Sequence, residues 1–322
     1  MAIQVGQQEA AMATPARGSG WRRLRRGELL PALLFISPWI VGFLWFQLYP
    51  IVASIRYSFT NYNMMQPPLP VGFDNYVRLF GDDELFRTAL TNTAVYALFS
   101  VPLDLAVALF FAVLLNLPIP GRAFFRTAFY FPAVIPTVAT SILWIMLFNT
   151  QGGLVNVAMD ALGAPSIPWL TSPTWAMPSL ILLSLWGIGP AIVIFLAGLQ
   201  DVPRDLYDAA QLDGAGALRL VRDVTIPMIS PVILFNLVIG MIAALQVFTQ
   251  PFILFGASQG GGSGNHGGPL NSALMYSVQL YTVAFQQFKM GYAAAMAWIL
   301  FAIIFVLSLL ALRLSNRYVH YE

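Results

Sequence analysis

Charged residues gather between Asp201 and Pro231, although only 9% of the chain is charged. Four aspartates lie in the front half of this stretch and two arginines in the back half, namely Asp201, Asp205, Asp208, Asp213, Arg219 and Arg222. Long apolar segments flank it on both sides. Carboxylates and guanidinium groups on a solvent-facing loop can form charge-assisted hydrogen bonds with another protein. The pattern therefore predicts a recognition surface, and no catalytic residue is expected in the chain.

The front half of this stretch predicts a short helix. Pro203 suits a first helical turn and Asp205 favours a helix N-terminus, while Gly214 and Gly216 can adopt the positive φ that ends a helix. A helix of about ten residues, about 15 Å long, therefore runs to about Asp213. One face of it carries small or apolar groups, with a carboxylate at its end, that would let another protein approach closely: Leu206, Ala209, Ala210 and Asp213.

A second helix is expected from about Ala217 to Thr225. It would end at Pro227, where the next membrane segment begins. On the residues alone, an ordinary connector between two membrane segments is the alternative to a protein-binding loop.

Polar side chains within two of the apolar segments could bind a solute. Amides and hydroxyls hydrogen-bond to sugar hydroxyls, and aromatic rings pack on the apolar faces of sugars. One segment offers Ser184 and Trp186, and another offers Asn236, Gln246, Thr249 and Gln250. These residue types suit a transient sugar site, and hydrogen bonding between helices is the alternative for each of them.

Asp104 is the only acidic residue within a predicted membrane span. An unpaired carboxylate in a bilayer costs at least about 2.5–3.5 kcal/mol, so it should pair, protonate or face water. A hydrogen bond within the helical bundle is the favoured role. An ion-coupling site, which would make the chain a self-contained secondary transporter, is the alternative.

Several kinds of chemistry have no support in the sequence. The chain has no cysteine and two isolated histidines, so we expect no disulfide and no metal site. No G-x-x-x-x-G-K-[ST] motif occurs, so the chain should not bind ATP itself. We expect no cofactor in this chain and no nucleic-acid partner.

Composition places the chain in a membrane. Of its residues, 58% are hydrophobic and only 9% are charged. In soluble proteins about 25% of the residues are charged. Because about 20 apolar residues span a bilayer, the gaps between charges predict an all-α protein with six spans. These are residues 30–55, 90–115, 127–148, 176–199, 230–255 and 291–312.

The basic residues predict the orientation. Six spans put both termini on one side, and if that side is cytoplasmic, all basic residues except four lie inside. The four outside are Arg56, Arg78, Arg87 and Lys289. The prediction is a multi-pass protein of the plasma (inner) membrane, with the loop 201–230 in the cytoplasm.

The first 28 residues are polar and small up to a basic cluster at Arg22–Arg26. They predict a disordered cytoplasmic tail with a basic membrane anchor. The following apolar run, Leu29 to Ile55, is too long for the core of a cleaved signal peptide. Residues 29–322 are therefore expected to form one six-helix domain.

The charged loop resembles the EAA loop of ABC importer permeases, which has E-A-A, three residues, G, and a downstream I-x-L-P. The matching residues are Asp208-Ala209-Ala210, Asp213-Gly214-Ala215 and Ile226-Pro227. Asp208 replaces the usual glutamate, and the usual leucine before the proline is absent. In that family the first helix of the loop, the coupling helix, docks on a cytoplasmic ATPase subunit. The resemblance gives this role to Leu206, Asp208, Ala209, Ala210, Asp213 and Gly214.

The likeness extends from about residue 30 to residue 322 and indicates the binding-protein-dependent sugar permeases, of the upstream-gene type that serves glycerol-3-phosphate, maltose or oligosaccharides. It is carried by Gly121-Arg122, Phe125-Arg126, Phe131-Pro132, Ile135-Pro136, Trp144, Phe148-Asn149, Gly153, Asn156, Trp169-Leu170, Trp186, Pro190, Ala197–Gln200, Gly291–Ala295 and Arg317–Glu322. In such permeases substrate contacts come from the fourth and fifth helices, where Trp186 and Phe248 match the motif letters.

The resemblance implies a membrane subunit of an ATP-driven importer for a carbohydrate or polyol, and no enzyme. Its expected partners are a second related permease, two ATPase subunits that bind ATP and Mg²⁺, and an extracytoplasmic solute-binding protein. The rival secondary transporter would use Asp104 for ion coupling. Such folds often contain two related halves, and residues 30–160 share no repeated motif with residues 170–312.

Overall fold

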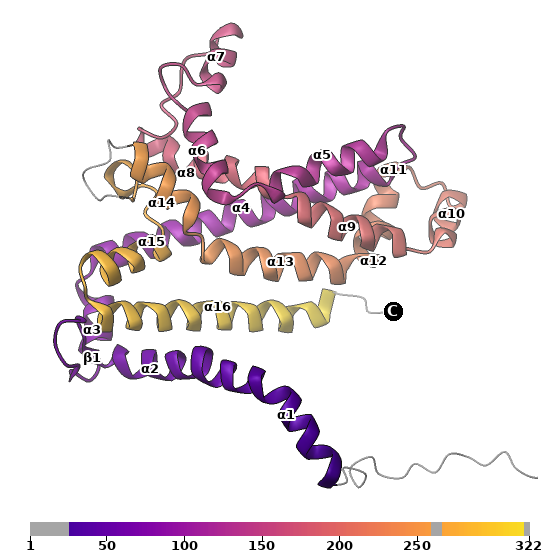
Figure 1. The fold of residues 1–322 in the computed structure, drawn as a ribbon. Helices are drawn as coiled ribbons and strands as arrows, with labels where there is room; N and C mark the ends of the chain where they lie inside the picture. The colour runs from indigo at the N-terminus through magenta and orange to yellow at the C-terminus, as the bar shows by residue number, and fades with distance from the viewer. Residues whose placement is uncertain (1–25, 259–265, 319–322) are drawn as a thin grey trace, which may run out of the picture. The chain divides into compact units, whose positions relative to one another are not determined.

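The computed structural model describes residues 26–258 and 266–318, and the predicted tail 1–28 lies outside it except for its last three residues (Figure 1). The regular elements of the described chain are helices apart from one two-stranded antiparallel ladder, β1 (Thr60–Asn61) with β2 (Leu69–Pro70). The prediction of a purely α-helical chain missed this small ladder. The described chain divides into two units, with the boundary between Ala53 and Ser54.

The first unit is dominated by one long apolar helical run. It contains α1 (Arg26–Phe43), the π-helix η2 (Leu44–Leu48) and the start of α2 (Tyr49–Ser58). Residues Pro31–Ser58 are long and apolar enough to cross a membrane, which agrees with the predicted span 30–55. Their side chains are almost all at the surface, including Phe35, Trp39 and Trp45.

Three more continuous runs meet the same test of length and composition. They are Glu84–Asn116, which is α4; Ser230–Gly256, which covers α13 (Ser230–Leu245) and most of α14 (Thr249–Ser258); and Met290–Ser315 within α16 (Met290–Tyr318). They coincide with the predicted spans 90–115, 230–255 and 291–312. With Pro31–Ser58, the described residues contain four continuous candidate spans.

The other two predicted spans are bent and are not straight helices. The run 127–148 is divided into α5 (Arg122–Val134) and α6 (Thr137–Leu147), which meet at 99°. Pro136 explains the break, because proline forces the residue before it out of the helical region, and Ile135 is extended at φ −73° and ψ 131°. Counting each bent pair as one span gives up to six spans in the described chain.

The second bend lies within the predicted span 176–199. Here α8 (Pro173–Ser184) and the 3₁₀ turn η3 (Leu185–Gly187) meet α9 (Gly189–Asp201) at 50°. Pro190 lies in the first turn of α9, where its missing N–H breaks no helical hydrogen bond. Gly189 faces the backbone of Phe129 in α5, where an added Cβ would lie 2.5 Å from the carbonyl oxygen.

The second unit is organised along α4, whose 33 residues give a length of about 50 Å. Near its start, Phe86 packs in a buried cluster with Tyr276 and Tyr292. Near its end, Leu115 packs in a different buried cluster with Leu199 and Ile229. Figure 1 shows the corresponding ends of this unit, with α3 at one end and α10 at the other. The two ends are therefore separated by most of the length of α4.

A cap of short elements covers the end where α4 and α16 begin. It consists of the β1–β2 ladder, α3 (Asp74–Gly81), α15 (Tyr276–Tyr281) and the π-helix η6 (Thr282–Gln286). The Gly291 N–H donates to the Tyr62 carbonyl at 3.0 Å, and a Cβ on Gly291 would collide with the Thr60 carbonyl oxygen. Burial raises the pKa of the Tyr276 phenol, which donates to the Met296 carbonyl at 2.7 Å.

The remaining elements are short and lie in connections. They are α7 (Leu154–Ala161), α10 (Arg204–Leu212), α11 (Ala217–Arg219), the π-helix η4 (Leu220–Thr225), α12 (Ile226–Met228) and the 3₁₀ turn η5 (Pro269–Asn271).

Candidate functional site

The predicted recognition loop forms a separate small helix, α10, which stands at one end of the second unit (Figure 1). It begins at Arg204, directly after Pro203, and Asp205 lies in its first turn. A carboxylate there is favourable because the N-terminus of a helix carries partial positive charge. The helix ends at Leu212, one residue before the predicted end.

Gly214 closes α10 with a left-handed backbone conformation, φ +82°. The Gly214 N–H donates to the Gln211 carbonyl at 3.0 Å, and the Ala215 N–H donates to the Ala210 carbonyl at 2.9 Å. These two bonds form a Schellman motif, which satisfies carbonyls that a helix end would leave unpaired. Gly216 differs from the prediction, because it lies at φ −76° and precedes α11 as an N-cap residue.

The second helix of the loop is longer than the predicted run from Ala217 to Thr225. Helical structure continues through α11, η4 and α12 to Met228, and α13 begins at Ser230. Pro227 therefore lies inside the run, in the first turn of α12, and does not end it. In a regular α-helix its ring would clash with the carbonyl four residues earlier, and the wider π turns of η4 precede it.

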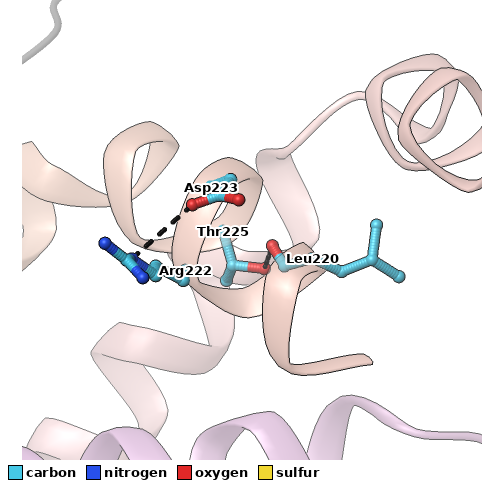
Figure 2. A network of polar contacts seen from close by, with 4 residues as sticks. All are labelled: Leu220, Arg222, Asp223 and Thr225. Atoms are coloured by element: carbon cyan, nitrogen blue, oxygen red, sulfur yellow. Dashed lines mark hydrogen bonds and ion pairs between the residues drawn. The ribbon is translucent and has the colours of Figure 1, made fainter. Parts of the chain in front are cut away.

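Figure 2 shows the polar contacts of η4. The Thr225 hydroxyl donates to the Leu220 carbonyl at 3.2 Å, within the same segment. Arg222 Nε lies 3.8 Å from Asp223 Oδ1, and these side chains are 85% and 64% exposed. An ion pair this exposed contributes little to stability. The charges of η4 therefore remain accessible to a partner.

One side of α10 attaches it to the rest of the unit. Tyr207 packs against the buried cluster that contains Leu199 and Ile229, and its hydroxyl lies 3.1 Å from Thr225 Oγ1. Thr225 is itself buried. The attachment fixes which face of α10 points outward.

The outward face contains the residues predicted to meet a partner. Leu206, Ala209 and Asp213 are exposed and Ala210 is half-buried. Asp208 is also exposed, and neither Asp208 nor Asp213 forms an ion pair with another described residue. Leu212 at the end of α10 and Leu218 in α11 are 90% and 83% exposed. An apolar surface bordered by free carboxylates suits a protein partner better than water.

The structure gives Ser184 a partner within the helical bundle. Its hydroxyl lies 2.8 Å from Asp104 Oδ1 and 2.8 Å from the Ile181 carbonyl oxygen. A hydroxyl has one proton, so it donates to one of these acceptors at a time. The bond to Asp104 joins α8 to α4, which is the structural role expected for the carboxylate.

Trp186 lies in the 3₁₀ turn at the bend between α8 and α9 and is partly exposed. Its ring meets the ring of Trp144 edge to face, with centroids 5.9 Å apart. Trp144 in turn lies 4.7 Å from the Phe148 ring. The Trp144 indole N–H is buried and has no hydrogen-bond partner among the described residues. Sequence reasoning did not assign Trp144 to the predicted solute pathway. Trp144 lies in α6, and its ring contact with Trp186 is compatible with such a role.

The other predicted pathway residues lie at the break between α13 and α14. Gln246 is the C-cap residue of α13, Thr249 begins α14, and Gln250 follows it. The side chains of these three residues form no hydrogen bond with another described residue. Phe248 contacts two rings, Phe252 at 5.0 Å and Tyr281 at 5.4 Å.

The two groups of pathway residues adjoin one buried cluster. Leu183, next to Ser184, and Val247, next to Phe248, both belong to it, and the Phe248 ring packs against it. Among the described ring contacts, none joins Trp186 to Phe248. The structure therefore brings the groups to one region without direct contact between their aromatic members.

Sequence reasoning missed the Tyr207–Thr225 contact, which positions α10. The sequence did indicate that Tyr207 points away from the face that carries Leu206, because adjacent residues on a helix point in different directions. The partner Thr225 lies 18 residues away and follows no spacing rule.

Comparisons with known proteins identify the family of the chain. The family described as "Binding-protein-dependent transport system inner membrane component" matches residues 104–320. The probable ABC transporter permease protein YesP of Bacillus subtilis (strain 168) is 40% identical over 299 residues, 92% of this chain and 94% of that protein. The lactose transport system permease protein LacF of Rhizobium radiobacter is 35% identical over 305 residues, 93% of this chain and 97% of that protein.

A solved structure has the same fold. It is a chain in the crystal structure of a bacterial alginate ABC transporter in complex with an alginate pentasaccharide-bound periplasmic protein. The TM-score is 0.78 and the identity 26%, covering 92% of this chain and 97% of that chain.

The fold and these likenesses define a multi-pass integral membrane permease of the ABC transporter class, which is not itself an enzyme. The chain belongs to the binding-protein-dependent transport system inner membrane component family.

Proposed function

We propose that this chain is a membrane subunit of an ATP-driven importer, and that it passes a carbohydrate or polyol across the plasma (inner) membrane. An extracytoplasmic binding protein delivers the solute. The chain works with a second related permease and two ATPase subunits, which bind ATP and Mg²⁺. Each bent helix pair counts as one span, so the chain crosses the membrane six times with both termini in the cytoplasm.

The observation that carries this proposal is the outward face of α10. A nine-residue helix is attached by Tyr207 on one side and leaves Leu206, Ala209 and Asp213 exposed on the other. An isolated helix this short is marginal in water, so its stability depends on the attachment and on the Gly214 closure. A rigidly presented apolar face with free carboxylates is the surface that a docking ATPase subunit needs.

The solute class is supported by the relatives and by the pathway residues. Relatives include a lactose permease and an arabinooligosaccharide permease of Bacillus subtilis. In this chain, Gln246, Thr249 and Gln250 lie within two residues of Phe248 in the sequence, and their side chains form no hydrogen bond with another described residue. Such groups bind sugars by hydrogen bonds and by packing on their apolar faces.

The hydrogen bond between Ser184 and Asp104 argues against the alternative that the chain is a secondary transporter coupled to an ion through Asp104. Asp104 already accepts a hydrogen bond from Ser184, which supports a bundle-stabilising role. Family membership also favours transport powered by a separate ATPase subunit.

The test is co-expression of the chain with its proposed ATPase and second permease, followed by pull-down and by ATP-dependent uptake in proteoliposomes. Leu206→Glu should abolish retention of the ATPase, because it places a charge in the docking face. Leu162→Glu is the matched control, since Leu162 is an exposed leucine after α7, away from the loop. Normal ATPase retention by Leu206→Glu would contradict docking through α10.

A further inference from the structure

A polar cavity of about 390 Å³ lies at the end of the second unit where α4 and α16 begin. Its wall is assembled from α3, the start of α4, α15 with η6, and the start of α16. None of its residues belongs to the α10 loop or to the predicted solute pathway. Because α4 is about 50 Å long, the cavity is far from α10.

Gln279 gives this cavity an unusual feature. The residue lines the cavity and is only 5% exposed, yet its side-chain amide forms no hydrogen bond with another described residue. Its backbone groups are already used, since its N–H donates to the Met275 carbonyl at 2.9 Å and its carbonyl accepts from the Thr282 N–H. The amide is not among the fully buried polar atoms without a partner in the described chain, so its atoms reach the open space of the cavity. The amide is therefore available to a molecule that enters the cavity.

Other polar groups of the cavity are held in place by the fold. Asp83 Oδ1 accepts from the Phe86 N–H at 2.8 Å and caps α4, while Oδ2 accepts from the Tyr292 hydroxyl at 2.7 Å. The Arg78 guanidinium carbon lies 5.4 Å from the centre of the Tyr292 ring. These contacts fix one wall before any ligand arrives.

The rim adds charges of both signs. Glu84 and Asp82 are exposed carboxylates, and Lys289 donates to Gln287 Oε1 at 3.1 Å. In the described chain, the charged groups of the cavity form no ion pair with one another. They therefore retain hydrogen-bonding capacity for a ligand.

The mixture of groups selects the chemistry of that ligand. Carboxylates accept hydrogen bonds, lysine and arginine donate them, and an amide does both, which is what the hydroxyls of a neutral saccharide require. Acids and bases lining one cavity disfavour a simple anion, and no group of three His, Cys, Asp or Glu among the described residues could hold a metal ion. The volume falls within the about 300–1,000 Å³ typical of small-molecule sites.

We propose that this cavity is a saccharide-binding site at the outer mouth of the permease, separate from the pathway at Trp186 and Phe248. The inference rests on the proposed function, which places this end of the chain outside the cell. Gln279 is its principal hydrogen-bonding residue, and Glu84 at the rim contributes a second contact. A solute released at the outer face would bind here before it enters the membrane.

The test uses the full chain in membranes with its partner subunits. Because the chain contains no cysteine, Lys289→Cys creates a single site for a membrane-impermeant maleimide at the rim. The probes are lactose and arabinotriose at millimolar concentrations, and the readout is slower labelling at position 289. Adding Gln279→Leu should raise the saccharide concentration for half-protection about tenfold, as expected for the loss of about one hydrogen bond.

Two further variants keep this test decisive. Gln286→Leu is the matched control, because Gln286 is an exposed neighbour that does not line the cavity, and it should leave protection unchanged. Glu84→Ala lies at the exposed rim and should weaken protection even if Gln279→Leu fails to assemble.

The outcomes separate this inference from the proposed function. If neither saccharide protects position 289, the inference is wrong, and ATP-dependent uptake measured in the same membranes shows whether the importer assignment stands without it. If only the unliganded binding protein protects, the cavity is a protein-docking surface and the saccharide site is refuted. Equal half-protection concentrations in Gln279→Leu and Gln286→Leu would also overturn it.

Discussion

The Tyr207 hydroxyl lies 3.1 Å from the Thr225 hydroxyl, and this contact joins the middle of α10 to the segment that leads into α13. A force applied to the outward face of α10 therefore reaches α13 through a direct side-chain contact as well as through the intervening backbone. Because α13 precedes Gln246, Thr249 and Gln250, the contact connects the proposed docking face with one part of the proposed solute pathway.

Tyr207→Phe should weaken this connection without removing the packing of the ring. A typical hydrogen bond contributes about 0.5–1.5 kcal/mol, so the chain should still fold and insert. ATP hydrolysis should become less dependent on solute, measured as the ratio of hydrolysis rates with and without loaded binding protein. Thr225→Val and the double variant complete a cycle, and strictly additive effects would show that the two hydroxyls do not act together.

Gly214→Asp should damage ATPase docking while leaving membrane insertion intact. A Cβ at φ +82° costs about 1–2 kcal/mol in backbone strain, and it would also intrude where a partner approaches. No atom lies within 4 Å of the position of that Cβ, so the strain does not come from a clash within the chain. Pull-down of the ATPase and solute-stimulated hydrolysis in reconstituted membranes measure the effect.

Asp208→Ala should reduce the same two readouts more mildly, because it removes one exposed carboxylate and leaves the helix closed. Gly214→Asn serves as the conformational control, since asparagine tolerates the left-handed region better than most residues. Wild-type docking and hydrolysis in both Gly214→Asp and Asp208→Ala would show that the loop is only a connector.

Asp104→Asn should leave uptake largely intact. An amide can still accept the hydrogen bond from Ser184 that the carboxylate accepts at 2.8 Å, whereas an amide cannot carry a coupling proton. Uptake in proteoliposomes is the measurement, with assembly checked by co-purification of the ATPase. Loss of all transport in a normally assembled complex would establish a functional role for the charge.

Gly291→Ala should destabilise the cap at the start of α16. The new Cβ would collide with the Thr60 carbonyl oxygen and lie 3.0 Å from the Tyr57 carbonyl oxygen, and overpacking of this kind costs about 1–3 kcal/mol. Gly240→Ala is the matched control, since its nearest neighbour would be Val101 Cγ1 at an ordinary 3.5 Å. Thermal unfolding in detergent should show a lower midpoint for Gly291→Ala only.

The features predicted correctly from the sequence were those set by local rules. Gly214 occupies the left-handed region at the end of a short helix, and the apolar runs at α4 and α16 are candidate spans by length and composition. The bend at Ile135–Pro136 was missed because a count of apolar residues gives the length of a membrane span and does not show whether its helix is straight. Pro227 was taken as a stop, whereas a proline can equally occupy the first turn of the next helix.

The cavity around Gln279 illustrates a different limit. Its residues come from segments separated by up to about 200 positions, and no spacing rule relates them. A buried glutamine in a six-residue helix gives no signal in the sequence, because the same residue could equally lie at the surface. Only the packing of α3, α4, η6 and α16 shows that its amide faces the cavity without a partner among the described residues.

The 99° bend between α5 and α6 has a consequence for how lipid surrounds the chain. Pro136 has no N–H, and a helix that stops leaves its last carbonyls without helical partners. Hydrocarbon cannot hydrogen-bond to them, so irregular backbone at membrane depth persists only against protein or water. Phe131, Val134 and Val138 around this bend are all exposed in the isolated chain. Lipid alone therefore cannot satisfy the backbone at this bend. We expect protein or water, and not annular lipid, to contact the face that contains it.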